Sequence, residues 1–280
     1  MPAMQTEQLI FMHIPKAAGQ TMRSIIARQY PSHEVFTVEH PISQTRLRSS
    51  DHTTQTRIFV GHVQFGFHEY LGSASAYVTV LREPMSRVLS LYRYIVTTPQ
   101  HFLHEQVADM GLVDFVSGQV DAEEIEDGQT RQIAGVTEGP VDRSSLARAK
   151  RNLAEDFAAI GLVERFDESL MLFKKRLGWK MPFYVRKNVT QRLPVDETTE
   201  AFEIIRHRNA LDLELYQFAR QFFQEDIRRE GPLFDVEVSA FQALNIAAGI
   251  YRDAREFAHH VENRAEHLLQ LPRHFSRREL

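Results

Sequence analysis

Residues 9–26, with the sequence LIFMHIPKAAGQTMRSII, set the class of fold for the first part of the chain. The apolar run at 8–14 is typical of a short buried strand. A turn follows, PKAAGQT, and apolar residues then recur at helical spacing over 20–30. Strand, turn and helix in this order predict the start of an α/β unit.

The turn itself has the chemistry of an anion site. Backbone N–H groups at a helix N-terminus can bind a phosphate, and Gly19 would let the chain approach it closely. Thr21 adds a hydroxyl donor and Lys16 a positive charge. The lysine precedes the glycine, so the GxxxxGK[ST] pattern is absent and a nucleoside triphosphatase is not favoured. A plain strand-to-helix turn with a solvated lysine is the alternative.

Composition narrows the classes of function. The chain has 280 residues, of which 43% are hydrophobic and 25% charged, as in an ordinary globular protein. Its formal charge of −4 gives no global basic field, so nucleic acid is not an expected partner. There are no cysteines, which excludes disulfides, thiolate metal sites and cysteine nucleophiles. We find no signal-peptide pattern and no apolar run of about 18 residues that would span a bilayer, and therefore expect a cytoplasmic protein.

Strands and helices alternate along the rest of the chain. Apolar runs predict further strands at 34–38, 57–62, 76–81 and 157–166, and helical spacing predicts helices at 84–98, 167–177, 198–208 and 209–229. This alternation predicts an α/β, P-loop-like three-layer fold with a central parallel sheet flanked by helices, together with a helical insertion. We expect the domain to span 1–235, with a C-terminal helical extension, 236–280, packed on it.

Polar side chains gather where three of the predicted strands end. The carboxyl ends of parallel strands share one edge, and ligands of such sheets bind there. The turn at 16–21, the pair Gly61–His62 and Arg82 all follow predicted strands. Their convergence is stronger evidence for a site than any one of them alone.

The segment LREPMSRVLSLYRYI, residues 81–95, carries a second phosphate-binding pattern. Arg82 ends a strand and Ser90 lies two helical turns further on, so the two could hold one phosphate from two sides. Alternatively, Arg82 pairs with Glu83 and Ser90 is a tolerated helix serine.

Together the two motifs resemble a known family. HIPKAAGQTM is similar to the phosphosulfate-binding turn of the sulfotransferases that use 3′-phosphoadenosine 5′-phosphosulfate (PAPS), and LREPMSRVLSLYRYI is similar to their second signature. The resemblance is to the carbohydrate branch, sulfotransferase family 2, which includes heparan sulfate 2-O-sulfotransferase. Further matches follow in order over about residues 9–225: VGHVQFG (60–66), GQTRQIAG (128–135), IGLVERFDESLMLFKKRLGW (160–179), NVTQR (188–192) and NALDLELYQFA (209–219).

The resemblance implies a donor, a product and a set of contacts. PAPS would be the donor, 3′,5′-ADP (PAP) the product, and no metal would be needed. Arg82 and Ser90 match the pair that holds the 3′-phosphate, and a loop with Asn188, Thr190 and Arg192 matches one that closes over the nucleotide. The residues that would cradle the 5′-phosphosulfate are Lys16, Ala17, Ala18, Gly19, Gln20 and Thr21. Ala17 and Gln20 depart from the family, in which hydroxyl residues are usual, so two side-chain donors are missing.

Sulfuryl transfer needs a base for the acceptor hydroxyl and a charge on the leaving side. His62 is the predicted general base, because the resemblance places a catalytic histidine at this position and an unperturbed histidine suits proton transfer near neutral pH. A histidine that merely ends a strand is the alternative. Lys16 would stabilise the bridging oxygen as the bond to sulfur breaks. His13, inside the first predicted strand, is expected to be a packed histidine.

Other candidates have weaker support. His68, Gln129 and Arg131 could contact the acceptor, the last two by resemblance only. The pairs His101/His104 and His259/His260 have spacings compatible with a metal, but no third ligand forms a pattern, so we predict no metal site.

Two other functions stay open, a small-molecule kinase with a degenerate P-loop and a nucleotide- or glycan-binding relative without catalysis. Eukaryotic relatives in the resembled family are Golgi membrane proteins, whereas this sequence has no anchor and no cysteines. The sequence therefore predicts a soluble, bacterial-type member. Its acceptor would be a carbohydrate or a small hydroxyl metabolite, and its C-terminal segment could form a homodimer interface.

Overall fold

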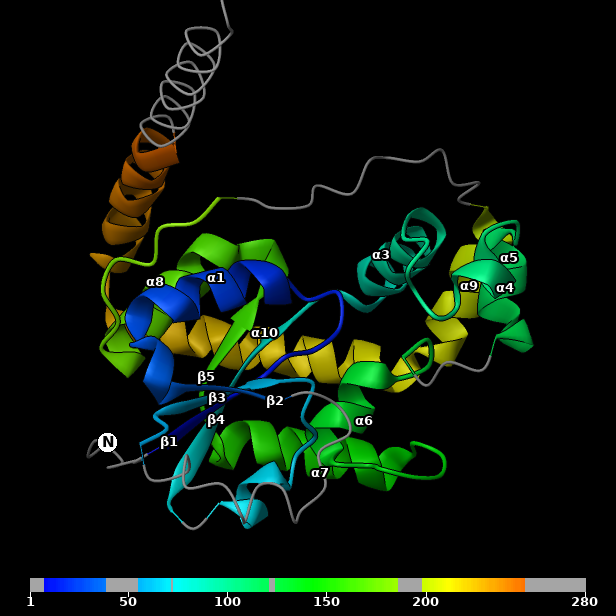
Figure 1. Cartoon of the computed structure of the whole chain (residues 1–280), viewed down its shortest axis with the longest axis horizontal. Coiled ribbons are helices and arrows are strands. Elements are labelled where there is room, and N and C mark those ends of the chain that lie inside the picture. Colours follow the sequence, from blue (N-terminus) through cyan, green and yellow to red (C-terminus); the bar gives the residue numbers. More distant parts are fainter. Residues whose placement is uncertain (1–7, 39–54, 72, 121–123, 186–197, 250–280) are drawn as a thin grey trace, which may run out of the picture.

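A computed structural model describes residues 8–38, 55–71, 73–120, 124–185 and 198–249. Five strands within them form one parallel sheet, as predicted (Figure 1). In order across the sheet they are β2 (Val35–Val38), β3 (Ile58–Gly61), β1 (Gln8–Met12), β4 (Ser75–Leu81) and β5 (Phe157–Leu162). The first strand is thus the central one, between β3 and β4.

Helices cover both faces of the sheet, which confirms the three-layer α/β fold. α1 (Gly19–Gln29) and α8 (Phe166–Leu177) lie on one side, and α6 (Gly128–Ala134) and α7 (Arg143–Glu155) on the other (Figure 1). α10 (Ala210–Glu230) contacts the edge strand β5. Burial of β3 and β4 on both faces accounts for their nearly continuous apolar sequences.

A second group of helices forms the predicted insertion and has its own apolar core. It includes Val88 and Ile95 of α3 and Ile205 of α9, all of which are buried. The members are α3 (Pro84–Thr97), α4 (His104–Val107), α5 (Leu112–Asp114), the π-helical turn η4 (Phe115–Gln119) and α9 (Thr199–Arg208).

Two element limits differ from the sequence prediction. β5 ends at Leu162 rather than at 166, because its neighbour β4 ends at Leu81, which pairs with Leu162, so the chain beyond has no ladder partner. Residues 163–165 form a 3₁₀ turn instead. Near the C-terminus a helix runs over 234–249, across the predicted boundary at 235, and buries Val238 and Phe241 in the main core. The division into 1–235 and 236–280 stays a prediction.

Candidate active site

The predicted polar residues meet at the carboxyl edge of the three central strands. His62 follows β3 directly, Lys16 follows β1 after the turn begins, and Arg82 follows β4. Arg82 Nη1 donates a hydrogen bond to the backbone oxygen of Lys16 at 3.1 Å, which joins two of the three segments. The edge therefore carries two cations and an imidazole on adjacent strands.

The turn after β1 is held in an unusual backbone conformation. Lys16 and Ala18 have φ values of 65° and 60°, in the left-handed region that non-glycine residues rarely adopt. α1 begins directly afterwards at Gly19, and its N-cap residue, Ala18, has no side chain that could accept a hydrogen bond. Backbone N–H groups of a first helical turn lack intrahelical acceptors, so this arrangement presents donors to an anion.

The structure gives a steric reason for the glycine at position 19. A Cβ atom added there would lie 1.5 Å from Nε2 of His13, far inside any allowed contact. The missing side chain makes room for a histidine ring, and the approach of a phosphate to Gly19 stays a prediction. Ala17, which replaces a hydroxyl residue of the resembled family, is buried in the main core.

The Lys16 side chain lies in a partly buried, positively charged environment. Its Nζ is 3.6 Å from the centroid of the Tyr94 ring, a cation–π contact. Burial, and secondly the charge of Arg82, lowers the pKa of Lys16 to about 8, against an opposing contribution from Glu124. An anion bound beside Lys16 would raise this pKa again.

This pKa predicts a basic limb in the pH profile. Lys16 is charged below about pH 8 and loses its charge as the pH rises through that value. Because kcat/KM reports the free enzyme, we expect it to fall above about pH 8. The Lys16→Arg variant keeps a cation at this position at all working pH values. Its profile should therefore lack the limb, even if its maximum is lower. A limb of the same position in both proteins would contradict the assignment to Lys16.

Gln129 fixes Arg82 rather than facing an acceptor. Its Oε1 accepts from the backbone N–H of Arg82 at 3.0 Å, and its Nε2 donates to the backbone oxygen at 2.9 Å. The side chain is fully buried. Both ends of the amide are therefore used within the protein, and the predicted contact with the acceptor is wrong for this residue.

A buried ion pair behind Arg82 escaped the sequence analysis. Nη2 of Arg87 lies 3.5 Å from Oδ2 of Asp212 and donates to the backbone oxygen of Glu124 at 2.8 Å. Asp212 also accepts from the backbone N–H groups of Gln129 at 3.1 Å and Thr130 at 2.7 Å. It thereby caps α6, the helix that carries Gln129. Arg87, Gln129 and Asp212 each lie in a family-like motif of the sequence, at 81–95, 128–135 and 209–219. This shared membership is the one signal that could have indicated their contact.

Asp127 belongs to the same buried cluster. It adopts φ 44° just before α6, and its Oδ1 accepts from the backbone N–H of Asp212 at 2.8 Å. Burial, and secondly the charge of Asp212, raises its pKa to about 7. Two close carboxylates with one arginine therefore hold the start of α6 in place.

His62 and His13 lie face to face at the end of β3 and β1. Their ring centroids are 4.1 Å apart with an interplanar angle of 29°. His62 is exposed, whereas His13 is half-buried and follows β1 directly instead of lying inside it. Burial, and secondly the neighbouring charge of His62, lowers the pKa of His13 to about 3.

The remaining predicted residues lie elsewhere. His68 bonds through Nδ1 to the Tyr77 hydroxyl at 2.9 Å. Tyr77 precedes the end of β4 by four residues, roughly 13 Å along the strand. The His68 ring is thus held against the side chain of Tyr77, and its predicted contact with an acceptor stays a prediction. Arg131 donates to the backbone oxygen of Gly139 at 2.9 Å.

The remaining predictions concern the 3′-phosphate pair, the loop over the nucleotide and metal binding. Ser90 lies buried on α3, the helix that starts two residues after Arg82. Glu83 does not need Arg82 as a partner. Its carboxylate caps α3 by accepting hydrogen bonds from the backbone N–H groups of Met85 and Ser86. The loop with Asn188, Thr190 and Arg192 lies outside the described residues. In the part of the chain that is described, no three His, Asp or Glu residues gather where they could hold a metal ion.

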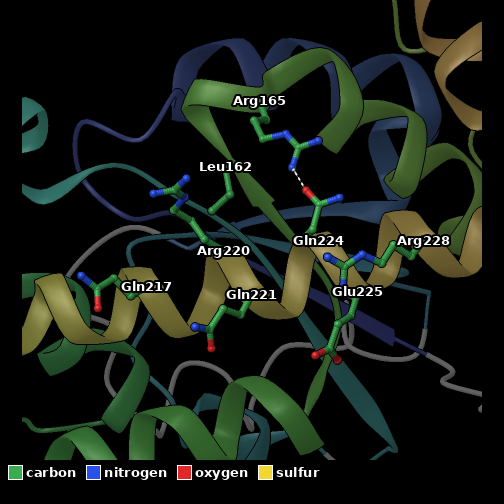
Figure 2. A pocket seen from close by; sticks show the side chains of 8 residues that line it. All are labelled: Leu162, Arg165, Gln217, Arg220, Gln221, Gln224, Glu225 and Arg228. Atoms are coloured by element: carbon green, nitrogen blue, oxygen red, sulfur yellow. Dashed lines mark hydrogen bonds between the residues drawn. The ribbon is translucent and has the colours of Figure 1, made fainter.

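A polar groove of about 530 Å³ lies apart from this edge, along α10 (Figure 2). It is lined by Leu162, Arg165, Gln217, Arg220, Gln221, Gln224, Glu225 and Arg228. Arg165 donates to Oε1 of Gln224 at 2.6 Å across it. Neither Lys16, His62 nor Arg82 lines the groove, and no sequence pattern predicted it.

Comparison with known proteins decides the family. Residues 4–138 match the profile described as "Sulfotransferase family". Over these residues, just under half of its length, the chain matches the sulfotransferase family. Mouse galactose-3-O-sulfotransferase 2 is 22% identical over 248 residues, and human galactose-3-O-sulfotransferase 3 is 26% identical over 249. Each alignment covers 79% of this chain but only 63% and 57% of the relative, so the chain spans about three fifths of their length.

These sulfotransferases correct the expected location. The predicted cytoplasmic location is wrong as a deduction from the sequence, because the matched relatives are mammalian galactose-3-O-sulfotransferases, and the eukaryotic members of the resembled family are Golgi membrane proteins. Within the described residues, no helix combines the length and the apolar character needed to cross a bilayer.

Proposed function

We propose that this sulfotransferase-family chain transfers a sulfuryl group from PAPS to a hydroxyl of a carbohydrate. The observation that carries the proposal is the meeting of Lys16, His62 and Arg82 at the carboxyl edge of β1, β3 and β4. The start of α1, whose N-cap residue is an alanine, adds backbone donors beside Lys16. Two cations and a helix start suit a donor that carries phosphates at both ends. The imidazole suits the removal of the proton from the acceptor hydroxyl.

Each residue has a defined task in the proposed reaction. His62 accepts the proton of the acceptor hydroxyl, and that oxygen attacks sulfur in line with the leaving oxygen. The new O–S bond forms as the bond from sulfur to the bridging oxygen breaks, and PAP leaves with the bonding electron pair. Lys16 stabilises the charge on the bridging oxygen, while Arg82 and Ser90 hold the 3′-phosphate. No residue needs to form a covalent intermediate.

The relatives' names direct the choice of acceptor. Mouse and human relatives are galactose-3-O-sulfotransferases, and we extend this to propose a galactose-containing carbohydrate as acceptor. A direct trial incubates the full chain with PAPS and a panel of galactosides, with glucosides as the matched neutral control. Sulfated galactoside is the expected product. Transfer to glucosides alone would contradict the proposed acceptor but not the proposal that PAPS is the donor.

The donor has a separate test in nucleotide affinity. A charge-assisted hydrogen bond contributes about 1.5–3 kcal/mol, so the Arg82 contact should make PAP bind about 10- to 150-fold more tightly than ADP. Calorimetry with PAP, ADP and 2′,5′-ADP measures this, the last having the same charge as PAP but a displaced phosphate. The Arg82→Gln variant should bind PAP no better than ADP. Equal affinities for PAP and ADP in the unmodified chain would reject PAPS as donor.

A small-molecule kinase is the competing function, and the same titration addresses it. A kinase would prefer ATP or ADP and would gain nothing from a 3′-phosphate. A binding protein without catalysis would show the PAP preference but no sulfated product with any acceptor.

A further inference from the structure

The ring of His13 occupies the space between the two halves of the site. The ring lies against the first turn of α1, where it occupies the space that a Cβ atom on residue 19 would need. The same ring stacks on His62 with a centroid distance of 4.1 Å. The ring of His13 therefore contacts both the turn that would hold the phosphosulfate and the imidazole that would take the proton.

The backbone of His13 is fixed by two hydrogen bonds, one to its N–H and one to its carbonyl oxygen. Its N–H donates to the backbone oxygen of Gly61 at 2.8 Å, which continues the β1–β3 ladder to the residue before His62. Its carbonyl oxygen accepts from Nε2 of Gln132 at 3.1 Å. The same Gln132 nitrogen donates to the Val63 backbone oxygen at 2.8 Å, on the other side of His62. His13 and the segment around His62 are thus tied together at the backbone as well as at the rings.

The identity of the ring is informative. Nδ1 of His13 is buried and has no hydrogen-bond partner among the described residues. Burying an unpaired nitrogen is unfavourable, so a side chain that only filled space would more favourably be apolar. An imidazole that is kept despite this cost indicates a role beyond packing.

We propose that His13 is a positioning residue of the transfer site, which sets the ring plane of His62 and its distance from the first turn of α1. This inference rests on the proposed function, in which His62 takes the acceptor proton. Burial, then the nearby positive groups His62, Arg23 and Lys16, hold the pKa of His13 at about 3. The ring accordingly stays neutral at any working pH, and it adds no positive charge against His62 when that residue becomes protonated.

The role of His13 bears on why residue 19 is a glycine. If the glycine makes room for the histidine, Ala at position 19 is harmful only while the imidazole is present. If the glycine serves the approach of a phosphate, Ala is harmful regardless of residue 13. A double-mutant cycle with Gly19→Ala and His13→Ala separates the two, because coupled positions deviate from additivity.

The experiment measures kcat, KM for PAPS, PAP affinity and the thermal unfolding midpoint for the four proteins of the cycle. His13→Ala should lower kcat by about 10- to 100-fold, as expected for a displaced catalytic group, and should leave PAP affinity and KM within about threefold. Gly19→Ala should lower kcat by about 100-fold in the unmodified chain but by less than about threefold in the His13→Ala background. His33→Ala, a change at an exposed histidine, is the control and should alter none of these values.

Several results would overturn the inference. These are an unchanged kcat in His13→Ala, a parallel fall of kcat and PAP affinity, or an equal cost of Gly19→Ala in both backgrounds. The unfolding midpoints give a readout that needs no reaction, because Gly19→Ala should lower the midpoint only when His13 is present. Failure of the proposed function is distinguishable, since the unmodified chain would then lack the PAP preference or the sulfated product before any variant is made.

Discussion

Replacement of His62 by alanine is expected to lower kcat by about 10²- to 10⁴-fold, the range for loss of a general base. His62 is exposed at the end of β3, beside the edge that carries Lys16 and Arg82, and is open to an incoming hydroxyl. Neither of the two cations depends on its side chain for the contacts described, so PAP should bind as before. Turnover with saturating PAPS and calorimetry with PAP measure the two quantities.

Two controls accompany this variant. His68→Ala removes a histidine that bonds to Tyr77 and has no task in the proposed reaction, so it should keep most of the turnover. Imidazole added to the solution should restore part of the activity of His62→Ala, because it can enter the space left by the side chain and accept the proton. A variant at position 62 with unchanged turnover would remove this histidine from the mechanism, and so would a loss that follows the loss of PAP binding.

Replacement of Arg87 by alanine is expected to lower the free energy of unfolding by about 3–5 kcal/mol, which is typical when one partner of a buried ion pair is removed. Arg87 is 1% exposed and Asp212 is 0% exposed, so the variant leaves a carboxylate without its cation in the protein interior. Urea unfolding of the two proteins under identical conditions gives the difference.

A matched arginine offers the comparison. Arg143 pairs with Glu214, two residues from Asp212 on the same helix, but the side chains are 73% and 40% exposed. Arg143→Ala should cost less than about 1 kcal/mol, because exposed ion pairs contribute little. Equal losses for the two variants would show that burial of the Arg87 pair does not govern its contribution. Arg87→Ala should also weaken PAP binding, since Asp212 caps the helix from which Gln129 holds Arg82.

Much of the fold followed from local patterns. The strand, turn and helix around Lys16 were predictable because apolar spacing and turn residues act over a few neighbours. The meeting of Lys16, His62 and Arg82 was predictable as well, because parallel strands bring their carboxyl ends to one edge. These two inferences needed no knowledge of which strand lies beside which.

The failures have a common origin in contacts between distant segments. His68 follows His62 by six residues, but its ring bonds to the hydroxyl of Tyr77 on β4, a contact that no local pattern predicts. Gln129 matched a motif, but only the packing of α6 shows that both ends of its amide bind the backbone of Arg82. The limit of β5 depended on where its neighbour β4 ends.

The sequence by itself determined the α/β class, the family and the edge at which the chemistry is expected, since each rests on short-range periodicity or on an ordered series of motifs. Only the tertiary structure decided that β1 is central, that Arg87 pairs with Asp212 and that His13 lies between Gly19 and His62. The last two depend on the packing of side chains from segments far apart in the chain. Close packing leaves space for one ring and no more, and no local pattern records that constraint.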